Sequence, residues 1–187
     1  MIARLFKAIY GILTARTEWP MPEMHSDKTA FDFSFKAIDG KPMPFAQYRG
    51  KVLLVVNTAS ECGYTPQYKG LEELSQRYAK QGLVVVGVPS NDFGAQEPGT
   101  DADIAQFCAK NYHTTFPLTH KEPVIGAGAH PFYKWIAGVL GEDHLPKWNF
   151  TKYLVGRDGA VRGLFPSKVK PESPELAKAI ETELTKT

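Results

Sequence analysis

Cysteine is scarce in this chain of 187 residues, because Cys62 and Cys108 are the only two. A structural zinc site needs about four ligands, and the sequence has neither a C-x-x-C motif nor paired histidines at metal-ligand spacing. Two cysteines are also too few for the disulfide framework of a small secreted protein. The sequence therefore predicts no metal site, and each cysteine has to be judged from its position in the fold.

An excess of one charge and long apolar runs are missing as well. The 22 basic and 20 acidic residues leave a net charge of +2, which provides no cationic field, so we expect no nucleic-acid partner. No segment approaches the run of about 20 apolar residues that crosses a membrane. The length and the ordinary share of charged residues, 22%, fit one globular domain.

The first 16 residues differ from the rest, because they contain basic residues and no acidic one. Apolar residues recur there at helical spacing: Ile2, Leu5, Phe6, Ile9 and Leu13. We predict an uncleaved amphipathic helix in residues 1–16, which either binds weakly to a membrane surface or packs on the domain. The alternative is a signal peptide, which would place the protein in the periplasm or outside the cell instead of the cytoplasm that we expect.

The remaining pattern predicts a polar linker up to residue 30 and one α/β domain over residues 31–187. Alternating Phe31, Phe33 and Phe35 before the Asp39-Gly40 turn predict a small N-terminal β-hairpin. The apolar runs 52–56 and 83–88 predict two buried parallel strands. We expect the helix between them to be capped by Thr65, to start at Pro66 and to stop at Gly82.

Further elements follow in the second half of the chain. The Thr100-x-x-Asp103 pattern predicts a helix start, residues 116–118 a short strand, and Pro131 the start of another helix. Residues 150–155 and 160–165 flank Asp158-Gly159 as a second hairpin, and a last helix begins at Ser173-Pro174. This order predicts a central mixed sheet with helices on both faces, that is, a thioredoxin-like fold with an added N-terminal hairpin and helix.

Cys62 is the best candidate for chemistry, since it follows a buried strand and precedes a helix. Reacting groups of open α/β sheets gather at this edge, and backbone N–H groups near a helix start favour a thiolate there. Gly63 lets the backbone turn tightly beside the sulfur. The alternative is an inert buried thiol.

Neutral hydrogen-bond donors are predicted close to the same edge. Gln96 lies in the loop after the second strand, and Trp148 and Asn149 precede the last hairpin. Amide and indole N–H groups could stabilise a thiolate and protonate a departing oxygen. Taken singly, each has a stronger alternative: Trp148 is more often a core aromatic, and Gln96 is more often a solvated loop residue.

Three blocks of unusual composition carry a resemblance to a known family. Residues 57–63 read Asn-Thr-Ala-Ser-Glu-Cys-Gly, residues 91–99 Asn-Asp-Phe-Gly-Ala-Gln-Glu-Pro-Gly, and residues 147–152 Lys-Trp-Asn-Phe-Thr-Lys. They resemble the signature blocks of the glutathione peroxidase family, over about residues 31–187. The resemblance implies a thioredoxin fold, no bound cofactor, and a catalytic tetrad of Cys62, Gln96, Trp148 and Asn149. Cysteine at position 62 resembles the non-selenium members.

The chain departs from the family pattern at a few positions. Asp92 replaces the usual glutamine and Ala95 a usual glycine, and Ser90 stands where many members have a third cysteine. Cys108 then remains as the resolving thiol and resembles that of thioredoxin-dependent members. The alternative is a core residue, because Cys108 shares an apolar helix face with Ile104 and would need part of that helix to unwind before it reached Cys62.

The resemblance implies a peroxidase whose substrates are hydrogen peroxide and organic or lipid hydroperoxides. We expect Cys62 to form a sulfenic acid, Cys108 to resolve it as a disulfide, and thioredoxin to reduce that disulfide. The short connection 142–147 resembles the monomeric members. Two alternatives remain: a one-cysteine peroxidase recycled by glutathione, and a peroxide sensor that passes its oxidation to a partner protein. Glu61, beside Cys62, is expected to face solvent.

Overall fold

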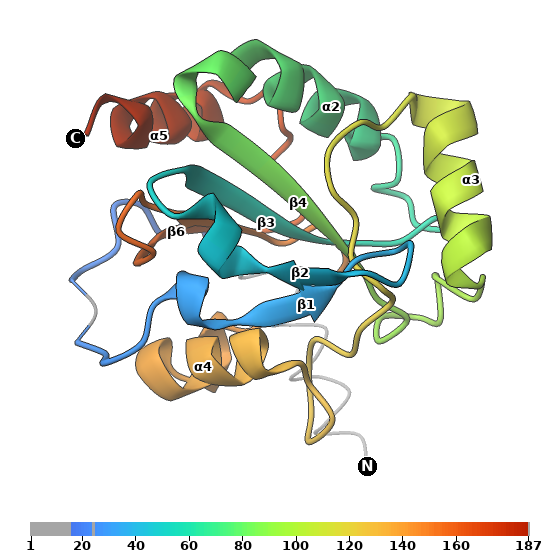
Figure 1. The fold of residues 1–187 in the computed structure, drawn as a ribbon, viewed down its shortest axis with the longest axis horizontal. Helices are drawn as coiled ribbons and strands as arrows, with labels where there is room; N and C mark the ends of the chain where they lie inside the picture. Colours follow the sequence, from blue (N-terminus) through green and yellow to red (C-terminus); the bar gives the residue numbers. More distant parts are fainter. Residues whose placement is uncertain (1–15, 24, 187) are drawn as a thin grey trace.

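Two adjacent parallel strands form the centre of the molecule, as the two apolar runs predict (Figure 1). The computed structural model describes residues 16–23 and 25–186. In it, β3 (Val52–Thr58) pairs in parallel with β4 (Leu83–Pro89) and antiparallel with β5 (Lys152–Val155), which pairs antiparallel with β6 (Val161–Phe165). The strand order β4-β3-β5-β6 confirms the predicted mixed sheet.

Helices cover both faces of this sheet. In Figure 1, α2 (Gln67–Tyr78) and α5 (Pro174–Thr185) lie on one side, and α4 (Pro131–Leu140) lies on the other. The predicted N-terminal hairpin, β1 (Ser34–Lys36) with β2 (Pro42–Pro44), lies on the side of α4. The remaining helix, α3 (Asp101–Tyr112), packs beside α2 and begins with the predicted capping box of Thr100 and Asp103.

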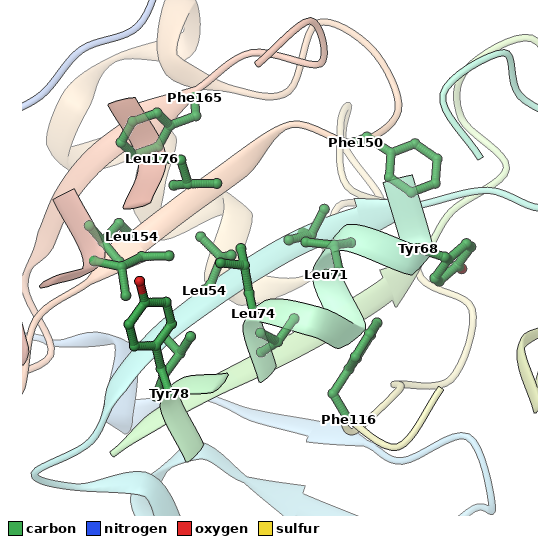
Figure 2. Packing of buried hydrophobic residues seen from close by; sticks show 14 of the residues in the cluster. Leu54, Tyr68, Leu71, Leu74, Tyr78, Phe116, Phe150, Leu154, Phe165 and Leu176 are labelled. Carbon is green, nitrogen blue, oxygen red and sulfur yellow. The ribbon is translucent and has the colours of Figure 1, made fainter. Parts of the chain in front are cut away.

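Alternating residues of β3 pack into two separate hydrophobic cores, because successive side chains of a strand point to opposite faces. Leu54 packs with α2 and α5, as Figure 2 shows with Leu71, Leu74 and Leu176. Leu53 instead packs with the aromatic side chains of α4 and the hairpin. Burying each such leucine contributes about 1.5–3 kcal/mol, and the sheet is therefore held on both faces.

The predicted strand at residues 116–118 is wrong. Only Leu118 forms a bridge, to Gly87 of β4, and the hydrogen bonds of Gly87 on this side go to Pro117 and Thr119. Pro117 has no N–H group, so it cannot continue a hydrogen-bonded ladder. The segment adds a single bridge to the edge of the sheet.

The N-terminal segment is described only from Arg16. The predicted amphipathic helix, apart from Arg16, lies outside the described residues, as does most of the alternative signal peptide. Glu18 exchanges two backbone hydrogen bonds with Leu164 of β6, and the Met21 N–H donates to Arg162, so residues 18–21 run along β6. The domain boundary at residue 30 stays a prediction. Within the described part of the chain, no helix has the length and apolar character of a membrane span.

Candidate active site

Cys62 lies in a tight loop between β3 and α2, at the predicted edge of the sheet. Its side chain is 8% exposed, while the flanking Glu61 and Gly63 are exposed, so the sulfur lies just beneath the surface and Glu61 faces solvent as predicted. The Tyr64 N–H donates to Cys62 Sγ at 3.4 Å. This backbone donor can stabilise a thiolate.

The predicted cap at Thr65 is wrong. The first helical residue is Gln67, and no side chain caps α2. The Thr65 hydroxyl instead accepts from the Cys62 N–H at 2.9 Å and donates to the Ala59 carbonyl at 2.8 Å. Both bonds fold the loop back on itself, because a buried hydroxyl binds whichever backbone groups lie nearest. Thr65 therefore shapes the cysteine loop.

Gln96 lies in the loop after β4, and a backbone hydrogen bond connects this loop to the cysteine loop. The Glu61 N–H donates to the Gln96 carbonyl at 3.0 Å. The Asn91 side chain accepts from the Glu97 N–H at 2.8 Å, and Asp92 accepts from the N–H groups of Val124 and Ile125 at 2.6 and 3.1 Å. The loop is thus fixed from three sides, and Asp92, noted as a departure from the family pattern, anchors residues 124–125.

Ala95 adopts a backbone conformation that favours glycine, with a φ of 51°. Left-handed φ is unfavourable for a residue with a Cβ atom. We expect Ala95→Gly to raise the free energy of unfolding by about 0.5–1 kcal/mol, the strain relief being partly offset by the larger entropy of glycine in the unfolded chain. Urea denaturation measures this, with the exposed, helical Ala102→Gly as the control that should lose stability. A loss at Ala95 would contradict the strain argument.

Asn149 and Gln96 are brought together, as the tetrad requires. Asn149 is buried, and its Nδ2 donates to Gln96 Oε1 at 3.0 Å and to the Phe93 carbonyl at 3.4 Å. Trp148 is half-buried, and its ring packs against Phe93 with centroids 5.8 Å apart. Within the described residues, none of the three side chains hydrogen-bonds Cys62 Sγ, which instead accepts from the Tyr64 N–H of its own loop. The Gln96 and Trp148 N–H donors make no hydrogen bond there either, so they can serve a ligand.

Asn57, the second-to-last residue of β3, holds the segment 148–151 in place. Its Nδ2 donates to the Trp148 carbonyl at 3.1 Å, and its Oδ1 accepts from the Thr151 N–H at 3.1 Å. The Phe150 N–H donates to the Asn57 carbonyl at 2.6 Å. Sequence reasoning did not assign Asn57 this role, although an amide inside an apolar strand is a signal, because it must find partners when buried.

Cys108 lies about one turn before the end of α3, with four helical residues after it, and its side chain is 1% exposed. Both cysteines are free thiols. Burial raises the pKa of Cys108 to about 11, partly offset by a hydrogen bond to Tyr68. Cys108 in this packed helix is therefore a neutral thiol near pH 7.

Glu97, the buried carboxyl group next to Gln96, has a shifted pKa. Burial raises the pKa of Glu97, and Ser60 and Lys121 partly offset that rise. Within residues 16–23 and 25–186, no three His, Cys, Asp or Glu side chains form a group that could hold a metal ion. His130 caps α4, because its Nδ1 accepts from the Phe132 N–H at 3.2 Å.

Comparison with known proteins shows which family this chain belongs to. The family model described as glutathione peroxidase matches residues 30–137. The chain belongs to the glutathione peroxidase family. It is a peroxidase, an enzyme that reduces hydroperoxides with electrons from thiols.

Relatives of this peroxidase share most of its domain. It is 50% identical over 148 residues to the glutathione peroxidase-like peroxiredoxin gpx1 of Schizosaccharomyces pombe, covering 78% of this chain and 93% of that protein. It is 44% identical to the hydroperoxy fatty acid reductase gpx1 of Synechocystis, covering 83% of this chain and 96% of that protein. The crystal structure of Trgpx in apo form is 39% identical, with a TM-score of 0.69 over 86% of this chain and 98% of that chain. Together with the strand order, this confirms the predicted thioredoxin-like fold.

Proposed function

We propose that peroxide oxidises Cys62, with Gln96 and Trp148 as hydrogen-bond donors to the reacting atoms and with Asn149 orienting the Gln96 amide as the fourth member of the tetrad. The observation that carries this proposal is the bonded pair of Asn149 and Gln96 on a loop that is joined to the cysteine loop through Glu61. The Cys62 thiolate attacks one oxygen of the hydroperoxide, and the O–O bond breaks. Cys62 becomes a sulfenic acid, and the second oxygen leaves with a proton as water or an alcohol.

The neutral donors suit this step because charge develops on the departing oxygen. The Trp148 indole and the Gln96 amide can donate without a negative charge that would oppose the thiolate, and the Asn149 amide that orients Gln96 is neutral as well. Preorganised donors of this kind act most strongly in a partly water-excluded site. The exposed carboxylate of Glu61 stays in solvent, where water screens it from the sulfur.

Replacing Asn149 by alanine is expected to slow oxidation of Cys62 about 100-fold, because the Gln96 amide loses the hydrogen bond that orients it, and losing one positioned donor of an oxyanion-type site costs about that much. Stopped-flow measurement of the second-order rate constant with hydrogen peroxide tests this. The control is Asn111→Ala, an exposed asparagine of α3, which should oxidise at the wild-type rate. An Asn149→Ala rate within about twofold of wild type would remove Asn149 from the proposed tetrad.

We further propose that Cys108 resolves the sulfenic acid. Its thiolate attacks Cys62 Sγ, a Cys62–Cys108 disulfide forms, and the hydroxyl leaves as water. A dithiol protein of the thioredoxin type then reduces the disulfide to two thiols and becomes oxidised itself. The position of Cys108 within the last five residues of α3 supports this, because a helix end unwinds locally at lower free-energy cost than the whole fold.

The proposed substrates are hydrogen peroxide and organic or lipid hydroperoxides, a range supported by the relative named as a hydroperoxy fatty acid reductase. The cycle needs no bound cofactor, because electrons come from the external thiol. We propose the cytoplasm as its compartment, where thiols such as these two free cysteines stay reduced; fractionation of cells tests this. The connection 142–147, one short 3-10 turn, supports a monomer, which sedimentation tests against the chain mass of 20.8 kDa.

A coupled assay of hydroperoxide-dependent NADPH consumption tests the function. One reaction contains thioredoxin with its reductase, and a parallel reaction contains glutathione with its reductase. The proposal predicts fast turnover with thioredoxin. Turnover with glutathione alone would make Cys108 a core residue, and absence of both, with Cys62 still oxidised by peroxide, would favour the sensor.

A further inference from the structure

Lys152, the first residue of β5, is a buried lysine beside the candidate active site. Its side chain is 0% exposed, and it is the only lysine or arginine in the buried class among the residues that the structure describes. No carboxylate of those residues lies at ion-pair distance from it. Burying an amine without an ion-pair partner is unfavourable, so this position calls for an explanation.

The explanation begins with its hydrogen bond. Lys152 Nζ donates to the Phe150 carbonyl at 2.7 Å, and no other described residue donates to that carbonyl. Burial lowers the pKa of Lys152 to about 7, against the attraction of the Glu172 carboxylate. The ammonium and the neutral amine both carry N–H groups, so the bond persists in either state.

Phe150 needs this support because its backbone is left-handed, with a φ of 64°. A residue with a bulky side chain avoids that conformation unless its surroundings fix it. Here the Phe150 N–H donates to the Asn57 carbonyl at 2.6 Å on one side, and Lys152 binds the carbonyl on the other side. The ring is buried against Tyr68, with centroids 5.5 Å apart, and Figure 2 shows these two rings near each other.

The conformation of Phe150 determines where Asn149 points. Asn149 directly precedes Phe150, and its Nδ2 lies 3.0 Å from Gln96 Oε1. A change of Phe150 to the usual negative φ would rotate the peptide group that joins the two residues. The Asn149 amide would then turn away from Gln96, and the donor pair would separate.

We propose that Lys152 is a positioning residue for peroxide reduction: by holding the Phe150 carbonyl, it fixes the turn that directs Asn149 toward Gln96. Lys152 itself touches no reacting atom. The inference rests on the proposed roles of Cys62 and Asn149 and adds to them a buried group that keeps the donor geometry in place between turnovers.

Lys152→Met tests this, because methionine has a similar length and no N–H group. We expect the second-order rate constant for Cys62 oxidation by hydrogen peroxide to fall at least tenfold. The urea midpoint should stay the same or rise, because no amine has to be buried. Lys152→Arg, which retains N–H donors, should restore part of the rate. The control is Lys168→Met, the same change at an exposed lysine, which should match wild type.

A second readout follows the Asn149 side chain directly. Its amide NMR signals should shift in Lys152→Met and stay in place in Lys168→Met. Wild-type oxidation and unshifted signals in Lys152→Met would overturn the inference. So would a slow rate that comes with a matching loss of stability and no rescue by arginine, since that indicates structural support only. If Lys152→Met does not fold, Lys152→Gln, whose amide is too short to reach the carbonyl, replaces it in the same comparison. If wild-type Cys62 is not oxidised at all, the proposed function has failed first, and this inference falls with it.

Discussion

Cys62→Ser is expected to abolish hydroperoxide turnover, with a loss of more than about 100-fold in the thioredoxin-coupled assay. A serine hydroxyl is a far weaker nucleophile than a thiolate at neutral pH, and its oxygen cannot be oxidised to a sulfenic acid. The substitution is nearly isosteric, and the backbone groups that shape the loop, including the Tyr64 N–H, remain in place. We therefore expect folding to be retained and the chemistry to be lost.

The matched control for Cys62→Ser is Cys108→Ser, the same change at the other cysteine. Circular dichroism and the urea midpoint of both variants establish that each one folds. With hydrogen peroxide and a sulfenic-acid probe, Cys108→Ser should be labelled and Cys62→Ser should not. Turnover above about one tenth of wild type in Cys62→Ser would show that another group reduces the peroxide.

Cys108→Ser is expected to separate oxidation from recycling. Oxidation of Cys62 should stay within about twofold of wild type, because Cys108 is buried in α3 and takes no part in the O–O cleavage. Turnover driven by thioredoxin should fall at least about 100-fold, because the sulfenic acid then has no internal thiol to form a disulfide. Single-turnover oxidation and the coupled assay, run on the same preparation, measure the two steps.

The burial of Cys108 explains why an opening step must precede resolution. With a pKa of about 11, only about one molecule in ten thousand carries the Cys108 thiolate at pH 7 while α3 is packed. Unwinding of the last five residues of α3, 108–112, exposes the thiol to water, removes the main cause of the raised pKa, and frees the side chain to move. Undiminished thioredoxin-driven cycling in Cys108→Ser would contradict this two-cysteine scheme.

The sequence predicts the fold well where hydrophobic periodicity decides it. The parallel pair β3 and β4 and the capping box of α3 follow from local patterns that tertiary contacts reinforce. The segment 116–118 was predicted wrongly because its apolar residues resemble a strand, while Pro117 prevents the ladder from continuing. Thr65 was predicted wrongly for a related reason: a threonine before a helix usually caps it, but this hydroxyl finds closer partners in the cysteine loop.

The candidate site shows the same limit. The three sequence blocks indicate which residues gather at the sheet edge, and the contact between Gln96 and Asn149 agrees with that expectation. The supports behind them have no local signal. A left-handed φ at Phe150 cannot be inferred from a residue type that normally avoids it, and a lysine at the start of a strand is normally exposed. Such features depend on contacts between segments distant in sequence, so only the structure reveals them.

The most direct test of the account is peptide mapping by mass spectrometry after wild-type protein reacts with one equivalent of hydrogen peroxide. Alkylation before digestion blocks the remaining thiols and prevents disulfide exchange. The account predicts a cross-linked pair of peptides that contain Cys62 and Cys108, two hydrogens lighter than their sum, and restored free thiols after incubation with reduced thioredoxin. Cys62 recovered as sulfenic or sulfinic acid beside an alkylated Cys108 would contradict it.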